Sequence, residues 1–152
     1  MGKRRPSIAQ KDNIQFAEQQ IAALNARDFE GYLSRIDDSY VGQSETAPGP
    51  IRGREGVRQN MEMIFGGFPD LRIEIVQIIA NGDSVVIRTR STGTHNGSFA
   101  GVAPTGKTVV VEGCTVTDIR NGKAIRGRLY SETATLLKQL GVLPLSKATT
   151  AS

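Results

Sequence analysis

Apolar residues recur at helical spacing in three segments of the N-terminal half of the chain. In the first segment, residues 9–25, they stand three or four positions apart, which predicts a helix with one apolar face. The residues of this face are Ile14, Ala17, Ile21 and Leu24. Similar spacing predicts a short second helix over residues 29–36 and a third helix over residues 54–65. Gly66-Gly67 is expected to end the third helix, because glycine readily adopts the left-handed conformation found at helix C-termini.

After residue 70, apolar positions alternate with polar ones, as expected for strands with one buried face. The alternation covers four segments: residues 71–80, 85–94, 108–119 and 124–132. Asn81-Gly82 joins the first two and Asn121-Gly122 the last two, and Asn-Gly in this position is a strong signal for a β-hairpin. With a short strand at residues 37–41, the pattern predicts an α+β fold. In this fold, three N-terminal helices pack on a curved antiparallel sheet.

Counting from the second hairpin predicts which side chains share a face of the sheet. A two-residue turn at Asn121-Gly122 pairs Arg120 with Lys123. Alternation then places one row of polar side chains on one face: Arg126, Arg128, Tyr130 and Glu132. Their predicted partners are small or carry hydroxyl groups, so this face is expected to border open space. The opposite face is expected to be packed core, with Ile125, Leu129, Cys114 and Val116. The first hairpin is less regular, and a β-bulge in one strand would shift the face assignments.

The composition fits one folded domain. A chain of 152 residues with 38% hydrophobic residues can bury a core and enclose a ligand cavity. We predict this domain over residues 9–144, between flexible tails at residues 1–8 and 145–152. Part of the net charge of +4 lies in the first tail, and the other basic residues are scattered among acidic ones, which argues against nucleic-acid binding. No segment approaches the roughly 20 apolar residues of a membrane span.

Few residues carry an obvious chemical signal. The single cysteine, Cys114, cannot form an internal disulfide and is typical of a small buried residue in a reducing cytoplasm. His, Cys and carboxylate residues show no cluster with metal-site spacing, so no metal site is expected. His95, the single histidine, lies where a strand meets a glycine-rich loop. A histidine there is either a structural hydrogen-bonding residue or part of a pocket wall.

Several motifs together resemble one family. Residues 93–106, Gly-Thr-His-Asn-Gly-Ser-Phe-Ala-Gly-Val-Ala-Pro-Thr-Gly, resemble the segment of SnoaL-like polyketide cyclases that typically reads G-T-H-x-G-x-F-x-G-x-x-P-T-G. Four further stretches fit this family in order: Phe68-Pro-Asp-Leu-Arg72, Gly82-Asp83, Asn121-Gly-Lys123 and Leu136-Leu-Lys-Gln-Leu-Gly141. The resemblance covers residues 10–144. It implies the cone-shaped α+β barrel of nuclear-transport-factor-like and ketosteroid-isomerase-like proteins, with a deep apolar pocket, in a homodimer or higher homo-oligomer.

The same resemblance implies a set of site residues. In the cyclases, an aspartate just before the Leu-Leu-x-Gln-Leu-Gly run is the acid/base, and this position is Glu132 here. Arg128 and Gln43 stand where the family often has histidines. We therefore expect Glu132 and Arg128 to be catalytic, with substrate bound by His95, Gln43, Tyr130, Arg126 and Phe65. The alternative for Glu132 and Arg128 is a surface ion pair at a strand edge.

The implied activity is aldol cyclisation of an aromatic polyketide ester. One carboxyl group can remove the proton between two carbonyls and later protonate the new alkoxide, if burial raises its pKa. The polyketide supplies its own electron sink, so neither metal nor cofactor is expected. Two alternatives stay open. One is cofactor-independent hydroxylation of an anthracycline-type substrate, in which Arg128 would hold a phenolate; the other is a non-catalytic carrier of a small apolar ligand.

Overall fold

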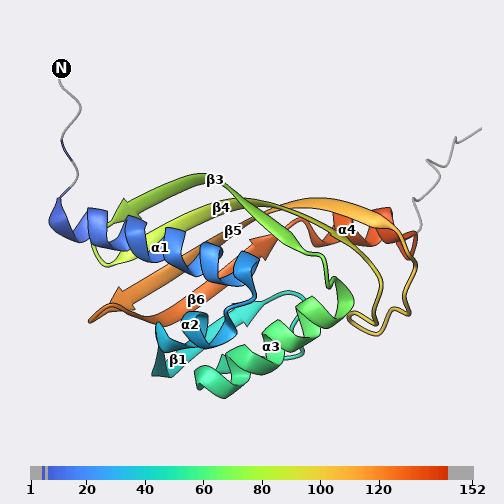
Figure 1. Ribbon diagram of the computed structural model, residues 1–152, viewed down its shortest axis with the longest axis horizontal. Coiled ribbons are helices and arrows are strands. Elements are labelled where there is room, and N and C mark those ends of the chain that lie inside the picture. The colour runs from blue at the N-terminus through green and yellow to red at the C-terminus, as the bar shows by residue number, and fades with distance from the viewer. Residues whose placement is uncertain (1–4, 6, 144–152) are drawn as a thin grey trace, which may run out of the picture.

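A computed structural model describes residues 5 and 7–143 (Figure 1). The predicted tail at residues 145–152, and residues 1–4 and 6 of the other tail, lie outside the described residues. The elements in chain order are α1 (Ile8–Ala26), α2 (Phe29–Ser34), β1 (Ile36–Ser44), β2 (Ile51–Arg52), α3 (Gly53–Gly67), β3 (Arg72–Asn81), β4 (Ser84–Thr94), β5 (Thr108–Arg120), β6 (Lys123–Ser131) and α4 (Thr133–Leu140). The predicted α+β class is confirmed.

One six-stranded sheet forms the body of the protein, in the order β2-β1-β6-β5-β4-β3. The helices α1, α2 and α3 cover one face, which we call the inner face; α1 packs mainly on β3, and α3 packs on β1 (Figure 1). The four long strands β3 to β6 pair antiparallel as predicted, but β1 runs parallel to β6, so the sheet is mixed. A parallel pair needs a long crossover connection, and here residues 45–122 supply it.

The ends of the helices follow from local hydrogen bonds. The Ser7 hydroxyl accepts from the Gln10 backbone N–H, and the Gln10 side chain accepts from the Ser7 N–H, which forms a capping box at the start of α1. The predicted role of Gly66-Gly67 at the end of α3 is wrong, since both glycines belong to the helix and neither has a positive φ. The small size of Gly67 serves packing instead, because a Cβ there would lie 2.8 Å from the Phe99 Cβ, whereas a Cβ on Gly66 would meet no atom within 4 Å.

The hairpins confirm one predicted turn and correct the other. Asn121 and Gly122 both have positive φ, at 53° and 73°, and Arg120 pairs with Lys123 as expected. In the first hairpin Asn81 pairs with Ser84, so the turn lies one residue later than predicted, at Gly82-Asp83. The bulge considered for this hairpin is present, between Ile75 and Gln77.

A bulge in the second hairpin reverses the predicted faces of β6, whereas Gly113, Thr115 and Thr117 of β5 lie on the open face as predicted. The register shifts beside Ile125, so that Arg126 pairs with Asp118 and Arg128 with Val116. Gly127, Leu129 and Ser131 therefore share the inner face with three small or hydroxyl-bearing residues of β5: Gly113, Thr115 and Thr117. The prediction that Arg126 and Tyr130 face the open space is wrong, as is the prediction that Leu129 faces packed core. Arg128 shares the alternation of Arg126 and Tyr130 but still borders the cavity. One extra residue moves every later side chain to the other face.

Candidate active site

A cavity of about 280 Å³ lies between the three N-terminal helices and the inner face of the sheet. Most of its wall is apolar, with contributions from Phe16, Leu24, Ile36, Met61, Ile87 and Leu136. The helices supply this wall because their apolar faces, predicted from helical spacing, are turned towards the sheet. The size is near the lower end of the range for small-molecule sites, which span about 300–1,000 Å³.

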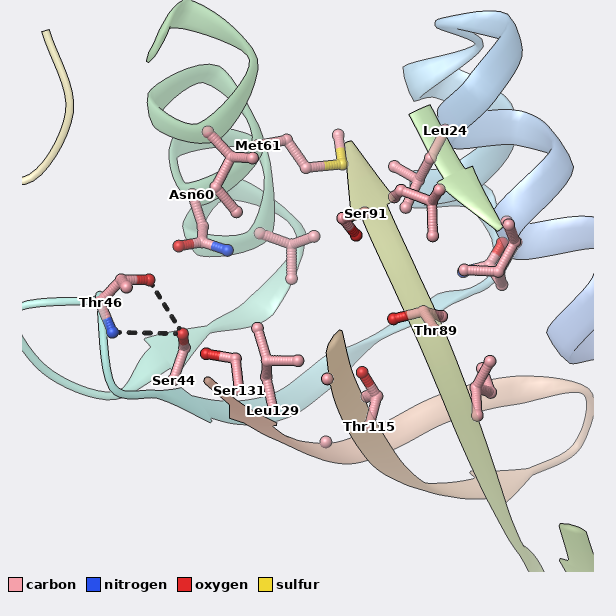
Figure 2. Close-up of a pocket in the computed structure, with 18 of the residues that line it drawn as sticks. Leu24, Ser44, Thr46, Asn60, Met61, Thr89, Ser91, Thr115, Leu129 and Ser131 are labelled. Carbon is pink, nitrogen blue, oxygen red and sulfur yellow. Dashed lines mark hydrogen bonds between the residues drawn. The ribbon is translucent and has the colours of Figure 1, made fainter. Parts of the chain in front are cut away.

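Hydroxyl groups interrupt the apolar wall on the side formed by the sheet. Figure 2 shows Thr89 and Ser91 on β4 and Thr115 on β5, with their side chains directed into the cavity. Among the described residues, none accepts or donates a hydrogen bond with these three side chains. They are therefore free to bind polar atoms of a ligand.

A polar side chain also faces the cavity from the helical side. Asn60 lies on α3, above Ser44 and Thr46 in Figure 2, and its Oδ1 is buried without a hydrogen-bond partner among the described residues. The hydroxyls of Ser44 and Thr46 are bonded to each other at 3.1 Å. Asn60 was not predicted as a site residue. A signal was present in the sequence, because Asn60 interrupts the apolar stripe formed by Val57, Met61 and Ile64.

Two tyrosines are the ionisable side chains best placed in the cavity wall. Burial raises the pKa of both Tyr32 and Tyr40, so both phenols are neutral at physiological pH. Tyr40 lies over two glycines that are paired across β1 and β6. A Cβ on Gly42 would lie 2.7 Å from the Tyr40 Oη, and a Cβ on Gly127 would lie 2.3 Å from it. These glycines make the space in which the tyrosine ring rests.

Three of the predicted site residues border the cavity: Phe65, Gln43 and Arg128. Arg128 donates a hydrogen bond to Gln43 Oε1, and its guanidinium lies 5.0 Å from the centre of the Tyr130 ring. Gln43 and Arg128 also border a second hollow of about 260 Å³, on the β1–β2 side of the cavity. Arg128 makes no ion pair with any described residue, so its positive charge is not neutralised by a neighbouring carboxylate.

Glu132 lies at the end of β6, where it closes the edge of β5. The side chain is exposed and is not among the residues that line the cavity. Its backbone N–H donates to the Glu112 carbonyl at 3.1 Å, and its Oε2 accepts from the Glu112 N–H at 2.9 Å. Val110 lies two residues before Glu112 on β5, and both its N–H and its carbonyl are hydrogen-bonded to the side chain of Gln139. β5 extends beyond β6, and these two side chains satisfy its free edge. The catalytic role of Glu132 stays a prediction.

The other predicted site residues lie away from the cavity. His95 is fully buried: its Nδ1 accepts from the Thr105 N–H at 3.2 Å, and its ring packs 5.3 Å from that of Phe68. Tyr130 and Arg126 lie on the outer face of the sheet, where Arg126 pairs with Asp118 at 3.2 Å. The structure therefore brings together Phe65, Gln43 and Arg128, and separates His95 and Arg126 from them.

Two features bear on metals and membranes. Within residues 5 and 7–143, no three His, Cys, Asp or Glu side chains form a cluster able to hold a metal ion. None of the helices in the described part of the chain combines the length and the apolar character needed to cross a bilayer.

The protein is a small α+β cone with an apolar cavity between its helices and its sheet, and comparison with known proteins identifies the family. Residues 14–140 match the SnoaL-like polyketide cyclases, and the chain belongs to this family. No curated protein matches it.

Solved structures support the same assignment. A "putative SnoaL-like polyketide cyclase" from Jannaschia sp. CCS1 is similar in fold: it is 21% identical, with a TM-score of 0.85 over 93% of this chain and 100% of the other. AclR, a "putative hydroxylase" from Streptomyces galilaeus, is 29% identical, with a TM-score of 0.79 over 89% and 99%. IdmH, a "putative polyketide cyclase" from Streptomyces antibioticus, is 28% identical, with a TM-score of 0.74 over 85% and 98%. Relatives named for either reaction thus share this fold.

Proposed function

We propose that this protein is an enzyme that binds an aromatic polyketide in the cavity and closes a ring on it by intramolecular aldol reaction. The observation that carries the proposal is the apolar cavity with free hydroxyls on its sheet wall, in a chain of the SnoaL-like family. Apolar walls suit a planar aromatic ligand, and a few polar groups fix its orientation. Thr89, Ser91 and Thr115 are donors for the carbonyl oxygens of such a ligand.

We assign the acid/base role to Glu132. The carboxylate removes a proton from the carbon between two carbonyls, and the resulting enolate attacks a ketone carbon to form the new bond. The same carboxyl then returns its proton to the alkoxide, so the product is an isomer of the substrate. The support for this role is position: Glu132 directly follows Ser131, which lines the cavity, and it stands where the family has its acid. Substrate would reach it at the end of β6.

A second candidate reaction is hydroxylation of a polycyclic aromatic polyketide. The specific observation is Arg128, a cation beside the cavity whose hydrogen-bond partner is the neutral amide of Gln43. A free cation stabilises a phenolate, the electron-rich form of the substrate that reacts with dioxygen. This reaction needs dioxygen and two electrons from a reductant supplied with the substrate. A relative named as a hydroxylase lends it further support.

Product mass separates the two reactions. We expect an open-chain aromatic polyketide ester to give an isomer of unchanged mass; a product heavier by one oxygen atom would favour hydroxylation. If the protein converts neither the open ester nor its closed anthraquinone-type product, both the cyclisation and the hydroxylation proposals are contradicted. Binding without turnover would leave the carrier function.

Two substitutions at Glu132 distinguish catalysis from closure of the β5 edge. Glu132→Gln keeps an acceptor for the Glu112 N–H, so unfolding free energy should change by less than about 0.5 kcal/mol while kcat falls about 10²-fold or more. Glu132→Ala should in addition lose about 1 kcal/mol of stability. An unchanged kcat in Glu132→Gln would show that the carboxylate is structural.

The outer face of the sheet supports the further proposal of a homodimer. Three large apolar side chains are about half exposed on it: Ile79 (51%), Val110 (45%) and Tyr130 (49%). Exposed apolar groups on an uncovered sheet suit contact with a second copy. Sedimentation analysis should give twice the monomer mass; a monomer at all concentrations would refute the proposal.

A further inference from the structure

Arg128 and Gln43 form a pair of side chains whose free hydrogen-bonding groups are mostly donors. Arg128 donates to Gln43 Oε1, and because arginine carries no acceptor, this contact fixes which end of the Gln43 amide is the oxygen. Gln43 Nε2 and the remaining N–H groups of Arg128 have no hydrogen-bond partner in the described part of the chain. Both side chains are exposed, so a ligand can reach these donors. A group that accepts hydrogen bonds is therefore what they can bind.

The positive charge of Arg128 also has no partner among the described carboxylates. Three other arginines of the sheet, Arg88, Arg90 and Arg126, each have a carboxylate oxygen within 3.8 Å. The Arg128 guanidinium instead lies 5.0 Å from the centre of the Tyr130 ring. A planar guanidinium that stacks on an aromatic ring still presents its N–H groups at its edge. The acceptor that suits Arg128 is therefore a negatively charged one.

This pair lies where the cavity meets the second hollow. Four residues line both spaces: Gln43, Ser44, Arg128 and Leu129. Figure 2 shows Ser44 and Leu129 on the cavity side of this boundary. The loop between β1 and β2 supplies the other walls of the second hollow, which measures about 260 Å³. The hollow thus has room for a substituent of a ligand whose rings lie in the cavity.

We infer that the second hollow is a subsite for a carboxylate group of the ligand, held by Arg128 and Gln43. The inference rests on the proposed function, which places the rings of an aromatic polyketide in the cavity. A carboxylate offers two oxygens to the guanidinium and supplies the missing negative charge. A methyl ester keeps a carbonyl acceptor but carries no charge, so it is the more weakly bound form. The preferred ligand is therefore a polyketide with a free carboxyl group.

Glu45 also lines the second hollow and works against an anion there. Its Oε2 accepts from the Thr133 hydroxyl at 2.7 Å, and it forms no ion pair with Arg128. Glu45 therefore weakens carboxylate binding without occupying the guanidinium. Glu45→Gln keeps an acceptor for Thr133 and should tighten carboxylate binding about twofold. Weaker carboxylate binding in this variant would contradict the subsite.

Arg128→Gln tests the subsite with three probes that share one ring system. The probes are anthraquinone-2-carboxylate, its methyl ester and unsubstituted anthraquinone. We expect wild-type protein to bind the carboxylate roughly 5- to 20-fold more tightly than the ester, between the values for an exposed ion pair and for a hydrogen bond to a charged group. Arg128→Gln should lose this preference and keep its affinity for anthraquinone. Titration calorimetry measures the affinities, and the wild-type preference should shrink at high salt.

Two further variants make the test specific. Gln43→Glu leaves Arg128 in place but sets a carboxylate beside the guanidinium, so it should also abolish the preference. Arg126→Gln is the matched control, because it removes one positive charge from the same strand at a residue that pairs with Asp118 away from the cavity. This control should keep the preference. An equal loss in Arg126→Gln and Arg128→Gln would show an effect of net charge alone and would overturn the inference.

The outcomes separate the subsite from the proposed function. If anthraquinone binds wild type but the carboxylate is not preferred, or if Arg128→Gln keeps the preference, the subsite is overturned while the proposed ligand class stands. If no anthraquinone binds wild type, the proposed ligand class fails, and a smaller pair of probes, naphthalene-2-carboxylate and its methyl ester, decides about the subsite. A preference for this carboxylate that depends on Arg128 supports the subsite. Equal binding of the two, or binding of neither, overturns it.

Discussion

Tyr40 and its two glycines allow a prediction in which one substitution rescues another. In the strand β6, Gly127→Ala places a Cβ 2.3 Å from the Tyr40 Oη but 3.2 Å from the nearest ring carbon. The hydroxyl is thus the main obstacle. Alanine is favoured over glycine in a strand by about 0.5–1 kcal/mol, whereas overpacking costs about 1–3 kcal/mol. The cost of overpacking exceeds the gain from replacing glycine, so we expect Gly127→Ala to lose about 1–2 kcal/mol of unfolding free energy.

Removing the Tyr40 hydroxyl should restore most of this loss. In Tyr40→Phe/Gly127→Ala the Cβ meets only ring carbon at 3.2 Å, which small shifts accommodate. Gly42→Ala is the matched control, because its Cβ would lie 2.8 Å from the Tyr40 Cε1, an atom that phenylalanine keeps. Tyr40→Phe should therefore rescue Gly127→Ala and leave Gly42→Ala destabilised.

The assay is a pair of double-mutant cycles by urea unfolding, followed by circular dichroism because the chain has no tryptophan. We expect a coupling energy of about 1 kcal/mol or more between Tyr40 and Gly127, and a smaller one between Tyr40 and Gly42. Equal coupling in the two cycles, or none in either, would refute the arrangement of the ring over the glycines.

Two further predictions concern the polar groups that fix the loop after β4. His95→Ala should lose about 2–4 kcal/mol of unfolding free energy, because it empties a fully buried site and removes the bond from the Thr105 N–H; a loss below about 0.5 kcal/mol in urea unfolding would contradict this role. Hydrogen bonds from the Thr94 N–H and hydroxyl lower the pKa of Asp70. A carboxyl group whose pKa is lowered in the folded state stabilises the fold at pH values above its ordinary pKa of about 3.9. This stabilisation is lost as the pH falls through the pKa of the folded state. The difference in melting temperature between wild type and Asp70→Asn should thus shrink from pH 7 to pH 3, and a constant difference would contradict it.

The sequence predicted helices better than it predicted faces of the sheet. The helix α1 and the Asn121-Gly122 turn depend on neighbouring residues, and both are present as expected. The buried face of α1 differs in part from the predicted one: of the four predicted residues only Ala17 is fully buried, and Ile14, Ile21 and Leu24 are half-buried. The bulge at Ile125 depends on how β6 fits between β1 and β5, which no local pattern records. Because one inserted residue reverses the alternation, the hairpin count placed Arg126, Arg128 and Tyr130 on the wrong face.

The candidate site was predicted only in part from the sequence. Family position pointed to Gln43 and Arg128, and both border the cavity. The inward hydroxyl of Thr89 was overlooked because threonine is common in strands and carries no signal of its own. The hairpin count did place Thr115 on the open face, but as a small partner rather than as a site residue. Asn60 was overlooked because one amide that interrupts an apolar helix stripe is a weak signal in a sequence.

The parallel pairing of β1 with β6 has a consequence for how the chain is made. Gln43 and Arg128 are hydrogen-bonded although 85 residues separate them, and β6 is the strand that joins β1 and β2 to the other half of the sheet. Contacts between such distant segments form late and slow folding. During synthesis on the ribosome, α1 can already pack on β3 and α3 on β1, but the two halves of the sheet stay unconnected until residues beyond 131 have emerged. A chain ending before β6 would lose the connection between its two halves, and would be a substrate for chaperones and proteases rather than a smaller version of the enzyme.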